Sequence, residues 1–138
     1  MARILSIDYG SKRVGFAVTD PLQIIATPLE TVASDKALAF IKQYLLTEPV
    51  ECFVIGEPLN LDDTPTHATP LVENFIRQLN KAFPNIPVKK VDERFTSKMA
   101  AAALVEANFK KKDRRKKENL DKISATLILQ TYLQSINK

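Results

Sequence analysis

The sequence predicts an α/β fold. We expect a five-stranded mixed sheet, made of an antiparallel three-strand meander and two parallel strands, with helices on both faces. Strand-like segments separated by short turns fill residues 1–31, and short connectors favour antiparallel pairing. Two later apolar strands each follow a segment of helical periodicity, and strands joined through a helix normally pair in parallel. Neither repeats nor linker composition divides the chain, so we expect residues 1–138 to form a single domain.

The strands of the meander are predicted at Arg3–Asp8, Arg13–Thr19 and about Gln23–Thr31. Turn-forming residues separate them at Tyr9-Gly10-Ser11 and Asp20-Pro21. The first strand therefore ends at an aspartate, which is depleted in strands and costly to bury unpaired.

A helix and a buried strand are predicted next. Ser34 is the expected N-cap of the helix, which should end before Pro49 because a following proline disfavours helical backbone. The strand Glu51–Gly56 contains the continuous apolar run CFVI, which is typical of a strand covered on both faces. The apolar stripe of the helix comprises Leu38, Ile41 and Leu45.

The second half of the chain begins with a polar, proline-containing loop at Pro58–Pro70 and a second helix that should stop at Pro84. The stripe of that helix is predicted as Leu71, Phe75, Leu79 and Phe83. The remaining predicted elements are a strand at Val88–Val91, a helix capped by Thr96 that runs through Ala100–Ala103, and a final helix from about Asn119 to Ile136.

The composition is that of an ordinary globular protein, with 45% hydrophobic and 26% charged residues. No segment has the roughly 20 consecutive apolar residues that span a bilayer, and the N-terminus lacks a basic region followed by an apolar run, so we expect a cytoplasmic protein without a membrane partner. The single cysteine, Cys52, lies in an apolar strand and is predicted to be a buried thiol.

The net charge of +4 is unevenly distributed. Residues 1–60 carry five Lys or Arg against seven Asp or Glu, whereas residues 61–138 carry fifteen against nine. Seven of the eight residues from Lys110 to Lys117 are basic. Such a segment can follow a phosphate backbone or be a solvated loop, and charge alone leaves both interpretations open.

Three acidic residues stand at positions where they could meet. Asp8 ends the first strand, Glu93 follows the last strand, and Asp121 lies in the first turns of the final helix, in line with an apolar stripe. Each has an ordinary explanation: a turn aspartate, a surface ion pair and an anion near a helix N-terminus. Together they predict a site for hard divalent cations such as Mg²⁺, because three close carboxylates repel each other without one.

Four motifs carry a resemblance to a known family over nearly the whole chain: IDYGSKRVGFAVTD, VIGEPLNLDD, VDERFTSKMA and LDKISATLILQTYL. In order and spacing they resemble the YqgF family of pre-16S ribosomal RNA nucleases, also described as Holliday junction resolvase-like proteins. The resemblance implies an RNase H-like fold. One motif departs from the family, which commonly has an apolar residue and a glycine where this chain has Glu57 and Asp63.

The resemblance also implies catalytic, metal-binding roles for Asp8, Glu93 and Asp121, with Mg²⁺ or Mn²⁺, in two sites, hydrolysing a phosphodiester. Substrates would be a ribosomal RNA precursor or branched DNA, and junction resolution would favour a homodimer. The candidate substrate-binding residues are Lys12, Arg13, Asn60, Arg94, Lys110, Lys111, Lys112, Arg114 and Arg115.

Two other classes of function stay open. The hairpin IDYGSKRVG also resembles the phosphate loop of sugar and acetate kinase-like ATPases, although the chain is short for a fold that needs a second domain. A non-catalytic nucleic-acid-binding factor would use the fold and the basic segment alone.

Overall fold

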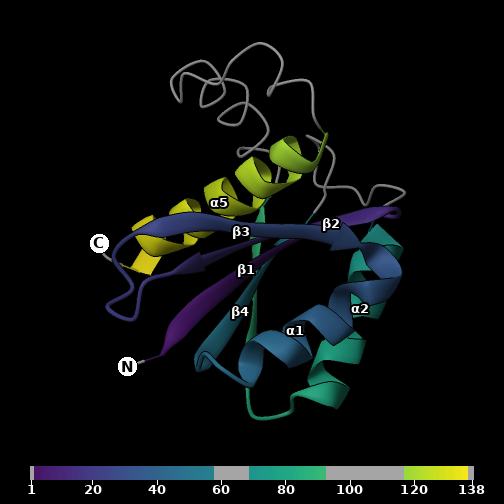
Figure 1. Ribbon diagram of the computed structural model, residues 1–138, viewed down its shortest axis with the longest axis horizontal. Coiled ribbons are helices and arrows are strands. Elements are labelled where there is room, and N and C mark those ends of the chain that lie inside the picture. Colours follow the sequence, from purple (N-terminus) through teal and green to yellow (C-terminus); the bar gives the residue numbers. More distant parts are fainter. Residues whose placement is uncertain (1, 58–68, 93–116, 137–138) are drawn as a thin grey trace.

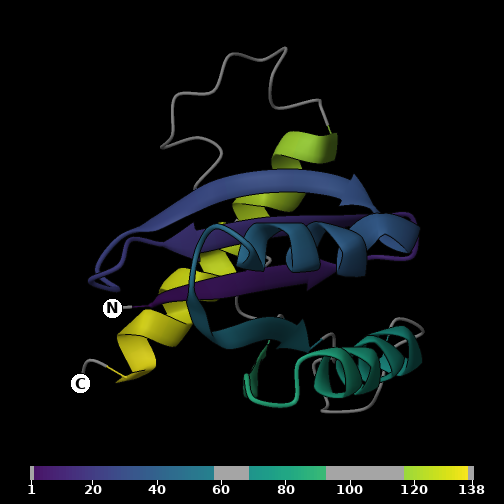
Figure 2. The ribbon, with the colours of Figure 1, turned by 60° about the horizontal axis from the view of Figure 1, so that its bottom comes forward.

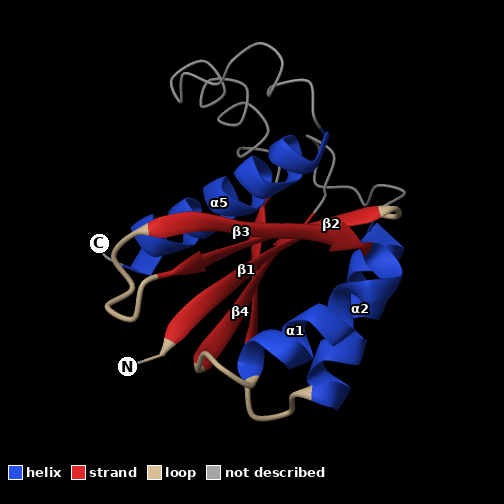
Figure 3. Ribbon diagram, in the orientation of Figure 1, coloured by secondary structure: helices blue, strands red, loops and turns tan. Residues whose placement is uncertain are grey.

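The computed structural model describes residues 2–57, 69–92 and 117–136, with side chains described up to residue 91 and again from residue 123. It contains a five-stranded sheet in the order β3-β2-β1-β4-β5. Strands β1 and β2, and β2 and β3, pair antiparallel, whereas β4 pairs in parallel with both β1 and β5. The predicted meander and the two parallel strands are therefore confirmed (Figure 3).

The strands follow the predicted segments closely. They are β1 at Arg3–Tyr9, β2 at Arg13–Thr19, β3 at Ala26–Ala33, β4 at Val50–Glu57 and β5 at Val88–Asp92. The helical elements are a short 3-10 turn, η1, at Ser34–Lys36, and the helices α1 at Ala37–Leu45, α2 at Thr69–Ala82 and α5 at Lys117–Ile136. The predicted helix from Thr96 through Ala100–Ala103 lies outside the described residues.

Helices cover both faces of the sheet. Figures 1 and 2 show α5 on one face and α1 with α2 on the other. Each face has its own core of buried side chains. Side chains of β1 point alternately to the two faces, so this strand contributes to both cores. Leu5 and Ile7 face α1 and α2, whereas Ile4 faces α5.

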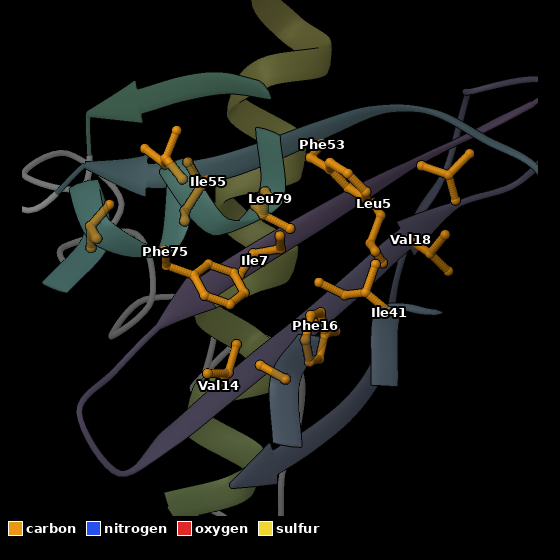
Figure 4. Packing of buried hydrophobic residues seen from close by; sticks show 14 residues of the cluster. Leu5, Ile7, Val14, Phe16, Val18, Ile41, Phe53, Ile55, Phe75 and Leu79 are labelled. Carbon is orange, nitrogen blue, oxygen red and sulfur yellow. The ribbon is translucent and has the colours of Figure 1, made fainter. Parts of the chain in front are cut away.

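The core beneath α1 and α2 contains most of the buried aromatic side chains. Phe16, Phe53 and Phe75 are at most 2% exposed, and Figure 4 shows Phe75 and Leu79 of α2 beside Ile7 of β1. Burying side chains of this size contributes about 1.5–3 kcal/mol each. This core therefore fixes α2 against the sheet.

Three details of the prediction were wrong. Strand β3 begins at Ala26 because Gln23 has a φ of 59° and belongs to the hairpin turn. Ser34 does not cap a helix: it lies in η1, and its hydroxyl donates to the carbonyl of Ser11 at 2.9 Å. Leu71 is 41% exposed. The buried stripe of α2 is Val72, Phe75, Ile76 and Leu79.

Other predictions are confirmed. Strand β4 is covered on both faces, with Cys52 and Val54 toward α5 and Phe53 and Ile55 toward α1 and α2. Cys52 is a free, buried thiol. On α5 the predicted stripe faces the core, with Ala125 and Ile128 fully buried and Tyr132 half-buried. Among the described helices, none is long and apolar enough to cross a membrane.

Candidate functional site at the carboxyl edge of the sheet

Asp8 lies near the carboxyl end of β1, where it is partly buried. Its side-chain direction follows from the strand: Ile4 packs in the core under α5, and the Ser6 hydroxyl donates to a carbonyl of α5. Side chains alternate along a strand, so Asp8 belongs to the same face. The strand therefore places this carboxylate on the α5 face of the sheet, beside the β1–β2 turn.

The carboxyl ends of β4 and β5 lie at the same edge, because both strands run parallel to β1. Ile7 pairs with Ile55, and Gly56 pairs with Val91. Gly56 is thus level with Asp8 and separates it from β5. Because glycine has no side chain, only backbone atoms of β4 lie at this level on the α5 face, between Asp8 and the end of β5.

Helix α5 runs from this edge toward the opposite end of the sheet (Figure 1). Two contacts fix its position. The Ser6 hydroxyl donates to the Ala125 carbonyl at 2.7 Å, and Tyr132 packs against the core that contains Cys52, near the amino end of β4. Helix α5 therefore runs antiparallel to β1 and β4, so that residues earlier in α5 lie nearer to Asp8. Asp121 lies one helical turn before Ala125, in the part of α5 that approaches the edge.

Several of the predicted site residues lie outside the described part of the chain. Glu93 follows the last residue of β5 but lies outside the described residues, and the side chain of Asp121 is also outside the description. The predicted substrate-binding residues that fall outside are Asn60, Arg94, Lys110, Lys111, Lys112, Arg114 and Arg115.

The two predicted basic residues that are described lie in the β1–β2 turn, next to Asp8. Lys12 is exposed and Arg13 is the half-buried first residue of β2. The turn is tight: the Gly10 amide donates to the Arg13 carbonyl at 3.0 Å, and a Cβ on Gly10 would lie 2.7 Å from that oxygen. Ser34 braces it, because its amide donates to the Lys12 carbonyl at 3.0 Å.

An ion-pair network that the sequence did not reveal ties this edge together. The Lys90 ammonium lies 2.9 Å from a Glu73 carboxylate oxygen and 3.3 Å from one of Glu57, so it joins β5, α2 and β4. The hydrogen bond from Lys90 to Glu73 raises the pKa of the lysine. These residues are far apart in sequence, and the parallel pairing of β4 with β5 and the packing of α2 bring them together.

A cavity of about 290 Å³ was also missed. It lies on the α1–α2 face, at the end of β1 beside Asp8. The cavity is lined by Tyr9, Ser34, Asp35, Leu38, Phe75 and Gln78.

The chemistry of the site fits a hard cation better than a soft one. Asp8 offers carboxylate oxygens, which Mg²⁺ and Mn²⁺ prefer. Cys52 is 7% exposed and lies in the core under α5, near the opposite end of β4, so this thiol cannot contribute to a site at Asp8. Among the described side chains, no group of three or more His, Cys, Asp or Glu lies close enough to hold a metal.

Sequence comparison gives consistent matches along the whole chain. Residues 2–135 match the family model RuvX, described as Holliday junction resolvase. A protein of Amoebophilus asiaticus named "Putative pre-16S rRNA nuclease" is 54% identical over 138 residues, covering 100% of this chain and 98% of the relative. A protein of the same name from Bacteroides thetaiotaomicron is 50% identical over 135 residues, covering 98% of each chain.

Structural comparison agrees with the fold. The chain superposes on Thermus thermophilus RuvC, solved in complex with a Holliday junction substrate, with a TM-score of 0.59. The match covers 98% of this chain and 96% of RuvC at 14% identity. RuvC has an RNase H-like fold, so the architecture implied by the sequence motifs is confirmed.

Proposed function

Since the chain belongs to the RuvX family, we propose that it is a nuclease that hydrolyses phosphodiester bonds in the precursor of 16S ribosomal RNA. The reaction type follows from the family, and the RNA substrate from the names of relatives that cover the whole chain. We also propose that residues 1–138 act as one domain, because α5 packs on the sheet formed by strands β1 to β5. We place this domain in the cytoplasm, because a ribosomal RNA precursor is its proposed substrate.

One observation carries the proposed site: the bond from Ser6 to Ala125 holds α5 on the face of β1 that bears Asp8. Asp121, one turn earlier in α5, is proposed as a second member. Glu93 is proposed as the third. Val91 packs under α5, and a strand that continued its alternation for two more residues would give Glu93 the same face.

In this proposal Asp8, Glu93 and Asp121 hold Mg²⁺ or Mn²⁺ in two neighbouring sites. Bound there, the ions would activate water and offset charge on the phosphodiester. Lys12 and Arg13 would bind phosphate beside Asp8, as their place in a braced turn allows. The remaining proposed substrate contacts come from Asn60, Arg94 and the basic segment, where Lys110, Lys111, Lys112, Arg114 and Arg115 would supply affinity that falls with salt.

The test compares Asp8→Asn with the wild-type protein on labelled 16S precursor RNA and on a four-way DNA junction, with Mg²⁺, Mn²⁺ or a chelator. We expect Asp8→Asn to abolish cleavage and to retain binding, because the substitution removes charge but little volume. Glu51→Gln is the matched control, since Glu51 is an exposed carboxylate at the opposite end of β4. Cleavage by Asp8→Asn at the wild-type rate would refute the site.

Branched DNA is the second candidate substrate. It is favoured by the description of the family model. Junction cleavage without cleavage of the RNA precursor would select it, and a homodimer in solution would then be expected, because paired cuts in a junction call for two symmetric sites. Binding of both substrates without cleavage of either, under every metal condition, would instead select a non-catalytic binding factor.

A further inference from the structure

Most of the exposed lining of the cavity at the end of β1 is polar, and the ring of Tyr9 contributes an aromatic surface to it. Phe75 is 2% exposed and its ring stacks against that of Tyr9, with centroids 4.4 Å apart and an interplanar angle of 24°. This stack holds the half-buried Tyr9 ring in one orientation. At the rim, Asp35 and Gln78 are exposed. The volume of about 290 Å³ lies at the lower end of the range of small-ligand pockets, about 300–1,000 Å³.

The cavity and the proposed catalytic site lie on opposite faces of the same strand end. Tyr9 directly follows Asp8, so the two side chains alternate across the sheet. The β1–β2 turn, with the exposed Lys12, joins both features. It is braced by Ser34, which lines the cavity and donates two hydrogen bonds to the turn, from its hydroxyl to the Ser11 carbonyl and from its amide to the Lys12 carbonyl. A polynucleotide crossing this edge would therefore meet both features.

We propose that this cavity receives one unpaired base of the nucleic acid, adjoining the phosphodiester held at Asp8. The inference rests on the proposed nuclease function and adds a structural requirement to its substrate. A base inside a duplex is paired and stacked, so it cannot enter a cavity on the protein. The preferred substrates are then single-stranded ends, loops and branch points.

The lining favours a base over a phosphate. The exposed part of the Tyr9 ring can stack on any base, whereas the carboxylate of Asp35 repels a phosphate. The same carboxylate accepts hydrogen bonds from exocyclic amino groups, and the amide of Gln78 both donates and accepts. Asp35 therefore favours adenine, guanine or cytosine over uracil at this position.

An abasic scan tests the proposal through binding. A labelled eight-nucleotide RNA without secondary structure, and a series in which each base in turn is removed, are titrated by anisotropy without divalent ions. We expect one position, or two adjacent ones, at which base removal weakens wild-type binding about tenfold, as for a lost stacking contact. In Gln78→Trp, which fills the cavity from its rim, binding should become insensitive to that removal.

Two further variants make the result interpretable. Tyr9→Leu removes the ring and should give the same insensitivity, and Asn80→Ala removes an exposed amide from the same helix and should behave as wild type. Thermal unfolding of each variant establishes that it is folded. If Tyr9→Leu does not fold, Gln78→Trp decides alone, because Gln78 is exposed on α2.

The binding assay separates this inference from the nuclease proposal. If removal of one base weakens RNA binding by the wild-type protein but not by Gln78→Trp, the result supports base binding in the cavity even if no substrate is cleaved. A wild-type protein that cleaves its substrate but shows no sensitive position, or the same sensitive position in Gln78→Trp, overturns the cavity and leaves the nuclease intact. Absence of both binding and cleavage overturns both.

Discussion

The hydroxyl of Ser6 in β1 donates a 2.7 Å hydrogen bond to the carbonyl of Ala125 in α5, across 119 positions of sequence. Both residues are fully buried. The bond gives the buried Ser6 hydroxyl a hydrogen-bond partner. It also fixes the position of α5 along its axis, because a shift of the helix by one residue would break the bond. It sets the distance of Asp121 from Asp8 along the helix.

Ser6→Ala should destabilise the protein by about 1–2 kcal/mol, the usual net cost of a lost buried hydrogen bond. Urea unfolding measures this. Ser135→Ala is the control, since Ser135 bonds within the last turn of α5 and is exposed. Equal free energies of unfolding for the two variants would show that the hydrogen bond from Ser6 to Ala125 does not stabilise the protein.

Gly10→Ala should distort the β1–β2 turn. The added Cβ would meet the Arg13 carbonyl at 2.7 Å, and that backbone oxygen cannot move away without shifting β2. We expect a loss of about 1–3 kcal/mol, typical of overpacking. Binding of the labelled RNA should weaken as well, because Lys12 lies in the same turn. Unchanged RNA affinity in a destabilised Gly10→Ala protein would exclude the turn from the binding surface.

The β2–β3 hairpin should loosen in acid. Asp20 accepts hydrogen bonds from the amides of Ile25, Ile24 and Leu22, and these bonds lower the pKa of its carboxyl below the ordinary value of 3.8. A lowered folded-state pKa gives stability that is present above 3.8 and is lost as the pH falls through the folded value. Amide chemical shifts of the two isoleucines should report this loss, and Asp20→Asn should remove the pH dependence.

Cys52 should resist thiol reagents until the protein unfolds. It is 7% exposed, and burial raises the pKa of its thiol, so the reactive thiolate is scarce at neutral pH. Labelling in increasing urea should follow the unfolding transition monitored by circular dichroism. Rapid labelling of the native protein would show that α5 opens locally from the sheet.

The architecture was predictable because local patterns and global topology agree. The run Cys52–Ile55 is apolar at every position, which is typical of a strand covered on both faces. Strand β4 is such a strand, and it pairs in parallel with β1 on one side and with β5 on the other. The alternation in β1 likewise separates Ile7 from Ser6 onto opposite faces. Boundaries were less predictable. Ser34 has the residue type of a helix cap but is used instead to brace a neighbouring turn.

The candidate site was predictable only in part. Asp8 could be found because an acid at the end of a core strand is unusual. The Lys90 network and the cavity could not, since both depend on register and on the side of the sheet, which no local pattern encodes. Gln78 reads as an ordinary exposed residue of an amphipathic helix, and only the packing of α2 brings it beside Tyr9.

Because α5 follows all of the described strands in the sequence, the side chains that it covers stay exposed until α5 has been synthesised and has docked. Ile4, Ala17, Val54 and Val91 then expose their apolar surface to chaperones and proteases. The proposed metal site would likewise be assembled only after α5 has docked, because Asp121 is one of its proposed members.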